Sequence, residues 1–305
     1  MKLAIFDDYR LGLVSTDERT IVDVSGVLPW PHDPDPLGAG WWVRLCRDFD
    51  ALRERIADAG RAGQPRPLDG VGLRAPVLNP TKIVAAASNY AAHREEMRTV
   101  SARTGGGSAQ QGWLSEFDVF LKAPSSIIGP GETCRLPAEP VAQHKEIHHE
   151  SELALVIGTG GAGIAEADAL RHVLGYTIGL DMTVRGAGDR SRRKSYDTFT
   201  PVGPWIATAD EVGDPHALEI RLMVNGEVRQ HVSSGDMSTR IPGIIAYASS
   251  VMRLEPGDVV LTGAPPGVNQ VHDGDVMEAS ISRIGSMRIP VRLAAAARSG
   301  ASQVL

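Results

Sequence analysis

Two glutamates at the head of an apolar strand constrain this chain more than any other feature. Glu150 and Glu152 flank Ser151 and come directly before the apolar residues 153–157. Side chains alternate between the two faces of a strand, so both acids share a face with Ala154 and Val156. Alternate acids often mark a strand face in contact with water, but here the same face continues with apolar residues. The pattern therefore predicts buried carboxylates, which must be protonated, paired or bound to a metal.

A third acid, Asp181, ends the apolar run of residues 174–180, where a strand can deliver a side chain to a site. The same position would also suit a helix cap or a turn. Three carboxylates around one point repel each other by about 3 kcal/mol per pair, taking ~5 Å and an effective dielectric constant of about 20. A divalent cation removes that conflict, and ligation by oxygen alone suits Mg²⁺, Mn²⁺ or Ca²⁺ better than Zn²⁺.

A histidine and a glutamate three residues apart form a second candidate group. Residues 90–100 are predicted to be helical, so His93 and Glu96 share one face. A carboxylate beside an imidazole orients the ring and supports its protonated form, which suits a general base that takes a proton from water. Such pairs are also common on exposed helices. Residues 101–112, with three consecutive glycines, are expected to be mobile and would let this helix close over a site.

Two further segments carry polar groups whose role is open from spacing alone. Lys194 follows the basic residues 190–193, for which a solvated basic loop is the simplest interpretation. Residues 255–258 predict a turn into a strand, and a Gly/Pro-rich loop follows that strand. Such loops often expose backbone N–H groups to a ligand, and many are simply turns.

The pattern along the chain predicts two parts. Residues 1–25 are typical of a small β meander, 29–40 of a loop, and roughly 47–60 of an amphipathic helix. The prolines at positions 65, 67, 76 and 80 indicate a linker. We therefore predict a small N-terminal domain with its linker over residues 1–78 and a catalytic domain over 79–305.

The larger part is predicted to be β-rich with a few helices. Residues 82–87 indicate a buried strand and residues 241–252 a helix. Residues 218–232 indicate a hairpin, because Asn225-Gly226 tolerates the positive φ angles of a type I′ turn.

The charge balance limits the partners of the chain. Its 31 basic and 37 acidic residues give a net charge of -6, which leaves no basic surplus to neutralise phosphates. We therefore expect neither a nucleic-acid nor an anionic-membrane partner.

The N-terminus lacks the apolar segment of a secretory signal, and no apolar run approaches the roughly 20 residues that span a bilayer. Two cysteines without metal-ligand spacing, Cys46 and Cys134, fit reduced thiols in a cytoplasmic protein.

Seven segments of the sequence, taken in order, resemble the fumarylacetoacetate hydrolase family over roughly residues 80–292. The first 75 residues resemble, more weakly, the small variable domain that many members carry. The matching segments are Asn89-Tyr90 with His93 and Glu96, residues 120–126 with 129–131, Glu150 and Glu152 with Leu153, residues 175–179 up to Asp181, Lys194 with residues 197–199, residues 203–205, and residues 254–268.

The resemblance implies a fold and a metal. The fold would be α+β and β-rich: a mixed β-sheet roll with a small N-terminal α+β domain, in a chain that forms a homodimer. One Mg²⁺ or Mn²⁺ would be bound by Glu150, Glu152 and Asp181, and Ca²⁺ is a further candidate.

The resemblance also implies roles for several side chains. His93 and Glu96 would activate water from a lid, and Lys194 would contact the substrate or an intermediate. Further substrate contacts are expected at Tyr90, Lys122, Arg185 and Ala264.

Two positions depart from the family pattern. Many relatives carry Arg-Asp-x-Gln where this chain has Arg185 followed by Gly186, Ala187 and Gly188, so a glutamine that contacts substrate is absent. Where relatives commonly carry Thr-Gly-Thr-Pro, this chain has Ala264 in place of the second threonine. These departures affect the identity of the substrate more than the chemistry.

The expected activity is hydrolysis of a carbon–carbon bond in a small acylpyruvate-like 2,4-dioxo acid, in aromatic or other carbon-compound catabolism. Decarboxylation, or isomerisation of a 2-hydroxy-dienoic acid, would use the same enolate and stays open. A protein that binds metal and small acids without turning them over is a third alternative, which the intact His93, Glu96 and Lys194 disfavour.

Overall fold

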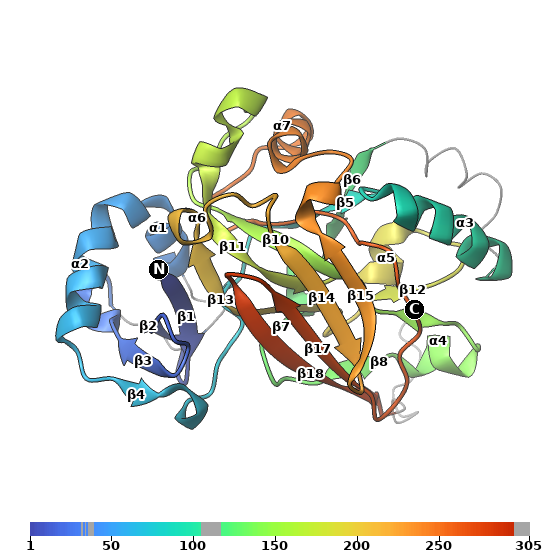
Figure 1. The fold of residues 1–305 in the computed structure, drawn as a ribbon, viewed down its shortest axis with the longest axis horizontal. Coiled ribbons are helices and arrows are strands. Elements are labelled where there is room, and N and C mark those ends of the chain that lie inside the picture. The colour runs from blue at the N-terminus through green and yellow to red at the C-terminus, as the bar shows by residue number, and fades with distance from the viewer. Residues whose placement is uncertain (32, 34, 36–39, 105–116, 296–305) are drawn as a thin grey trace, which may run out of the picture.

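The computed structural model describes residues 1–31, 33, 35, 40–104 and 117–295. Within these residues the strands form three sheets (Figure 1). The 11-stranded sheet has the order β4 (Arg66–Pro67), β3 (Thr20–Asp23), β2 (Arg10–Val14), β1 (Lys2–Phe6), β13 (Thr200–Thr208), β11 (Val173–Leu180), β10 (Ser151–Ile157), β16 (Val259–Leu261), β5 (Ile83–Ala87) and β6 (Asp118–Lys122), with β7 (Ile127–Ile128) paired to β13.

The second sheet has five strands among the described residues, and the third has two. The five-stranded sheet has the order β15 (Glu227–Ser233), β14 (Glu219–Val224), β17 (Val276–Ile281), β18 (Gly285–Leu293) and β8 (Cys134–Leu136), and β12 (Thr183–Val184) pairs with β9 (Ile147–His148). The α-helices are α1 (Gly40–Arg47), α2 (Phe49–Ala62), α3 (Ala91–Thr104), α4 (Ala138–Ala142), α5 (Arg190–Lys194), α6 (Ala209–Val212) and α7 (Ile241–Val251).

Parallel and antiparallel pairs occur in the same sheets. Strand β16 pairs in parallel with β5, and β18 in parallel with β8, whereas β10 is antiparallel to both of its neighbours. The predicted α+β class with mixed β-sheets is confirmed.

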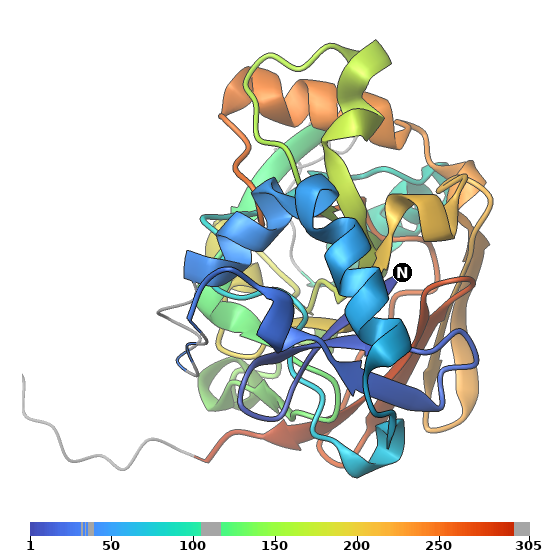
Figure 2. The same ribbon diagram turned by 90° about the vertical axis from the view of Figure 1, so that its left-hand side faces the viewer.

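Strand β10 is buried on both of its faces, as its sequence predicted. Leu155 and Ile157 belong to the hydrophobic cluster that includes β14, β17 and β18 of the five-stranded sheet. Ala154 and Val156 belong to a second cluster, which includes Trp42 of α1 and apolar residues of α2. The five-stranded sheet and the N-terminal helices therefore lie on different sides of the large sheet (Figures 1 and 2).

The predicted N-terminal meander is present as β1, β2 and β3, and it extends the large sheet. Leu3 of β1 pairs with Ile206 of β13, so the sheet runs across the predicted boundary near residue 78. That boundary stays a prediction. The helix predicted over roughly residues 47–60 corresponds to α2, whereas α1 was not predicted. Part of the predicted loop 29–40 lies outside the described residues, and its last residue begins α1.

Helix α3 is longer than the sequence predicted. It continues to Thr104, so Ser101–Thr104, expected to be mobile, are helical. The physical reason is local bonding: Arg103 donates to Glu146 at 2.9 Å, and the Thr104 hydroxyl donates to the carbonyl of Val100 at 2.9 Å. The rest of the predicted mobile stretch lies outside the described residues.

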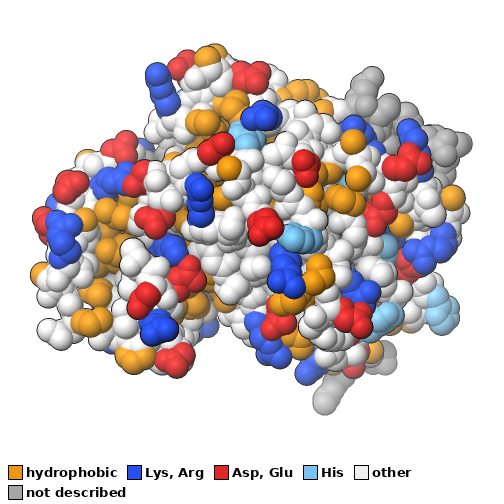
Figure 3. Space-filling view, in the orientation of Figure 1, with side chains coloured by type: hydrophobic (Ala, Val, Ile, Leu, Met, Phe, Trp, Pro, Cys, Tyr) orange, Lys and Arg blue, Asp and Glu red, His pale blue; other side chains and the backbone are white. Residues whose placement is uncertain are grey.

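The predicted hairpin and the later helix are confirmed as β14–β15 and α7. Asn225 and Gly226 at the turn have φ angles of 53° and 81°, as a type I′ turn requires. Among the described residues, no helix is long and apolar enough to cross a membrane. Acidic and basic side chains are interspersed over the face in Figure 3.

Gly175 of β11 leaves no room for a side chain. A Cβ there would lie 2.3 Å from the carbonyl oxygen of Ala207 and 2.9 Å from Cα of Thr208, both of them backbone atoms of β13. Gly175→Ala should therefore lower the free energy of unfolding by roughly 1–3 kcal/mol, measured by urea denaturation. Gly26→Ala is the control, because its Cβ would meet no atom of the described part of the chain within 4 Å. Equal stability of the two variants would contradict this packing of β11 on β13.

Candidate active site

The structure brings three carboxylates together beside the end of β11. Glu150 and Glu152 stand at the start of β10, and Asp181 directly follows β11, its antiparallel neighbour. The Asp181 N–H donates to the carbonyl of Glu150 at 2.8 Å, which fixes the two chain segments side by side. Ligand atoms of the three side chains lie within 4.8 Å of one another, and all three residues are buried.

Three cations neutralise part of this cluster: Lys194, Arg185 and, on the other oxygen of Asp181, Lys122. The Lys194 ammonium lies 2.7 Å from Glu150 Oε2 and 2.5 Å from Asp181 Oδ2. The Arg185 guanidinium donates to Oε1 of Glu150. Burial alone would raise the pKa of Glu150, but the charges of Lys194 and Arg185 outweigh it and hold this pKa well below its usual range.

The charge of Glu152 is compensated less than that of Glu150. Glu152 accepts a hydrogen bond from the backbone N–H of Gly263 at 2.6 Å and makes no ion pair with any described residue. Burial, followed by the charges of Asp181 and Glu150, raises the pKa of Glu152 well above its usual range. A positive charge beside Glu152 would therefore be favoured. Three hard oxygen donors around it fit a divalent cation such as Mg²⁺ or Mn²⁺, so the cluster forms a candidate divalent-metal site.

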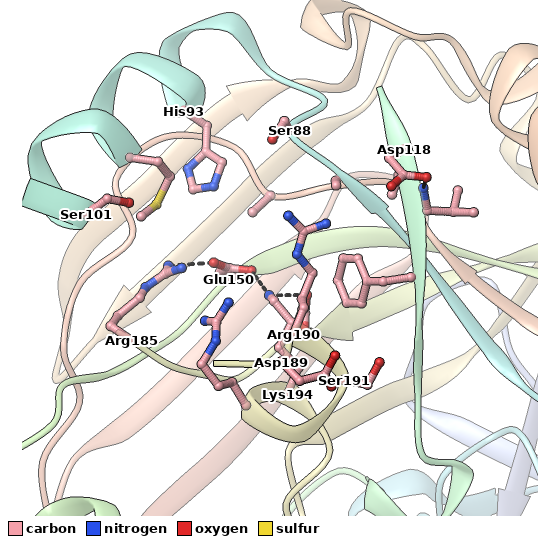
Figure 4. Close-up of a pocket in the computed structure, with 18 of the residues that line it drawn as sticks. Ser88, His93, Ser101, Asp118, Glu150, Arg185, Asp189, Arg190, Ser191 and Lys194 are labelled. Carbon is pink, nitrogen blue, oxygen red and sulfur yellow. Dashed lines mark hydrogen bonds and ion pairs between the residues drawn. The ribbon is translucent and has the colours of Figure 1, made fainter. Parts of the chain in front are cut away.

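The predicted histidine–glutamate pair lies across the cavity from the carboxylates. His93 Nδ1 is 3.2 Å from Glu96 Oε2, and the His93 ring points from α3 into the cavity (Figure 4). The backbone N–H of Gly267 donates to both oxygens of Glu96, at 3.1 and 3.2 Å. Gly267 has a φ of +92°, and its Cβ would lie 2.0 Å from the carbonyl oxygen of Arg229, so this anchor requires glycine. The Gly/Pro-rich loop thus holds the glutamate of the pair.

The carboxylates and His93 line one cavity of about 500 Å³. Arg185, Lys194 and Ala264 also lie on its wall, as does Gly188. Gly188 has a φ of +112°, and no atom of the described residues lies within 4 Å of the position of its Cβ.

The structure places Tyr90 and Lys122 behind the cavity wall. The Lys122 ammonium is buried against Asp181 Oδ1 at 2.5 Å and donates to the carbonyl of Phe199 at 2.9 Å. The Tyr90 hydroxyl is buried and has no hydrogen-bond partner among the described residues. The predicted contacts of these two residues with the substrate stay predictions.

Residues 190–193, interpreted from sequence as a solvated loop, are part of the short helix α5. The Asp189 side chain caps this helix by accepting a hydrogen bond from the N–H of Arg192 at 2.9 Å. Arg192 is exposed, whereas Arg190 and Arg193 line the cavity. These two arginines were missed from sequence, and the signal for Arg190 was its spacing of one helical turn from Lys194.

The part of the chain that carries this site matches a known family. Residues 82–292 match the model of the fumarylacetoacetate hydrolase C-terminal domain. The chain belongs to the fumarylacetoacetate hydrolase family. The resemblance noted from its ordered motifs is confirmed, with nearly the predicted limits, and the chain is an enzyme of this family.

Three relatives illustrate how close the similarity is. A maleylpyruvate hydrolase of Aquipseudomonas alcaligenes is 40% identical over 293 residues, which cover 96% of this chain and 99% of the relative. The crystal structure of a maleylpyruvate hydrolase of Sphingobium sp. SYK-6, in complex with manganese(II) and pyruvate, has a TM-score of 0.82 at 41% identity and covers 96% of this chain and 99% of its own. A 2-hydroxyhepta-2,4-diene-1,7-dioate isomerase of Mycobacterium marinum has a TM-score of 0.70 at 30% identity, with 96% and 98% covered.

Proposed function

We propose that this chain is a divalent-metal-dependent hydrolase that cleaves a carbon–carbon bond in an acylpyruvate-like 2,4-dioxo acid. The observation that carries the proposal is the position of the His93–Glu96 pair across one cavity from three buried carboxylates. The similarity to two maleylpyruvate hydrolases over nearly the whole chain supports the same class of reaction.

Glu150, Glu152 and Asp181 would hold the cation, which when bound supplies a Lewis acid for the 2-oxo and carboxylate oxygens of the substrate. Mg²⁺ and Mn²⁺ are the candidates, with Ca²⁺ as a third, and the presence of manganese in the Sphingobium relative favours the first two. Lys122 contributes from behind the wall, because its ammonium fixes one oxygen of Asp181.

His93 acts as the general base. Glu96 holds Nδ1 of its ring, so the other ring nitrogen is available to take a proton from a water molecule. The hydroxide oxygen bonds to the C4 carbonyl carbon, the bond between C3 and C4 breaks, and its electron pair stays with the pyruvate part as an enolate. The proton that His93 took from water then returns to C3, which gives pyruvate and a free carboxylic acid. Arg185 on the wall can donate to an oxygen on which negative charge develops, and the Lys194 ammonium, whose three N–H groups bond to Glu150, Asp181 and Thr183, adds positive charge beside it.

The second candidate is isomerisation of a 2-hydroxy-dienoic acid to its oxo form, favoured by the similarity to the Mycobacterium marinum isomerase. Decarboxylation would also begin from a 2-oxo acid in this cavity. The three reactions differ in their products: pyruvate with a second acid, CO₂, or a tautomer with a changed ultraviolet spectrum. An assay of these products with Mg²⁺ or Mn²⁺ and an acylpyruvate tests the proposal. The homodimer and the cytoplasmic location remain part of the proposal as predictions.

A further inference from the structure

Gln230 is a buried polar residue on a strand that is otherwise in contact with solvent. Strand β15 runs along the edge of the five-stranded sheet, and Gln230 is the one residue of this strand that is fully buried. Buried strand positions usually carry apolar side chains, because burying an amide costs free energy unless its hydrogen bonds are made. Gln230 neither lines the cavity nor belongs to the carboxylate cluster. Its amide therefore needs a role that an apolar side chain could not fill.

The oxygen of this amide is bound to the chain segment that carries Glu150 and Glu152. Oε1 of Gln230 accepts a hydrogen bond from the backbone N–H of Ser151 at 3.0 Å, and Ser151 lies between the two glutamates. Nδ1 of His149 lies 3.2 Å from the same oxygen. A backbone N–H can only donate, so the oxygen end of the amide must face β10.

The nitrogen of the same amide is bound to the Gly/Pro-rich loop. Nε2 of Gln230 donates to the carbonyl of Pro265 at 2.9 Å. Pro265 and the residue after it are both prolines, so neither has an N–H that could bond elsewhere. Two side chains make the hydrogen bonds that join residues 264–268 to other described residues: Gln230 at Pro265, and Glu96 at Gly267. The position of this part of the loop relative to β10 therefore depends on Gln230.

The start of the loop is fixed separately. The N–H and the hydroxyl of Thr262 both donate to the carbonyl of Leu153, at 3.0 and 2.8 Å. The next residue, Gly263, donates its N–H to Glu152 at 2.6 Å. The contact of the loop with the carboxylate cluster is thus held by Thr262, and the amide of Gln230 acts on the later part, which holds Glu96.

We propose that Gln230 is a positioning residue that fixes the His93–Glu96 pair at its distance from the carboxylate cluster. One amide links the two groups, because its oxygen is bound beside Glu150 and Glu152 and its nitrogen to the loop that anchors Glu96. A shift of the loop would move Glu96, and with it the ring of His93. The inference rests on the proposed function, in which His93 is the general base.

Amide hydrogen exchange tests this link without any turnover. Gln230→Met keeps the length of the side chain and removes both bonds, so the Gly267 N–H should exchange at least about 10-fold faster in the Mg²⁺-loaded chain, as measured by NMR. The Thr262 N–H should keep its rate and serves as the internal reference. Gln230→Asn keeps an amide that is one methylene too short to reach both partners, and it should release Gly267 as well.

Ser249→Ala is the matched control. It also removes a buried side-chain bond to a backbone N–H, that of Ile164, at a place outside the cavity wall. It should lower the stability of the chain and leave the exchange of Gly267 and the kinetics unchanged. Thermal unfolding confirms that each variant is folded.

Kinetics with an acylpyruvate separate positioning from a general loss of stability. Gln230→Met should lower kcat about 10-fold, while KM and the dissociation constant of Mn²⁺ should change by less than about 3-fold. In a Glu96→Gln background the same substitution should lower kcat by no more than about 2-fold, because Gln230 acts through Glu96.

An unchanged exchange rate at Gly267 in both Gln230 variants would overturn the assignment. Fully multiplicative losses of kcat in the double variant would also overturn it, as would a loss of Mn²⁺ affinity as large as the loss of kcat, since Gln230 would then support the carboxylates instead. The proposed reaction is tested separately by its products. Faster exchange at Gly267 in a chain that does not cleave acylpyruvates would refute the reaction and leave the link through Gln230 standing.

Discussion

Replacing His93 by alanine should lower the turnover of an acylpyruvate by at least about 10²-fold, because the water molecule would lose its general base. The affinity for Mn²⁺ should change little, since the ring is paired to Glu96 and does not belong to the carboxylate cluster. Steady-state kinetics and Mn²⁺ titration of the same preparation measure both quantities. Activity within a few-fold of wild type would show that another group activates water.

The adjacent residues Glu95 and Glu96 provide a second test and its control. Glu96→Gln keeps a group that can bond to His93 but removes the negative charge, so turnover should fall by about 10-fold or more. Glu95 is the matched position, since it is exposed and paired with Arg98 at 2.6 Å. Glu95→Gln should have wild-type kinetics. Equal losses in both variants would indicate an effect on α3 as a whole.

Glu152→Gln should weaken Mn²⁺ binding by at least about 10²-fold and abolish activity, since a charged oxygen ligand is lost. The metal-free protein should be at least as stable as wild type at neutral pH. The reason is that Glu152 has no cationic partner and is repelled by Asp181 and Glu150. Isothermal titration with Mn²⁺ and urea denaturation measure the two effects.

Asp181→Asn should differ from Glu152→Gln in stability, although both should lose the metal. Asp181 is paired with the ammonium groups of Lys122 and Lys194, and its loss leaves buried positive charge uncompensated. The free energy of unfolding of the metal-free protein should therefore fall by about 3 kcal/mol. Equal stability of the two variants would contradict the charge distribution described for this cluster.

The metal cluster could be predicted from sequence because its geometry follows from strands alone. Period-two alternation places Glu150 and Glu152 on one face, and the apolar run before Asp181 indicates the second strand. Antiparallel pairing of β10 with β11 then brings the start of one strand to the end of the other. The side-by-side position of His93 and Glu96 was also predictable, because residues three apart in one helix share a face.

The second set of cavity residues could not be predicted in this way. Helix α5 is five residues long and has no apolar periodicity, so its sequence resembles that of a solvated loop. The direction of Arg190 depends on its contact with Phe120, which is distant in sequence. The pairing of β1 with β13 likewise joins segments that are far apart in the sequence, and no local pattern specifies it.

The most direct test of the proposed reaction is the product balance of the wild-type chain with Mn²⁺ and an acylpyruvate. The account predicts one pyruvate and one carboxylic acid for each substrate molecule consumed, both lost on exhaustive chelation and restored by Mn²⁺. Release of CO₂ with the acyl chain retained, or an ultraviolet change without any fragment, would contradict hydrolysis and assign the site to one of the other two reactions.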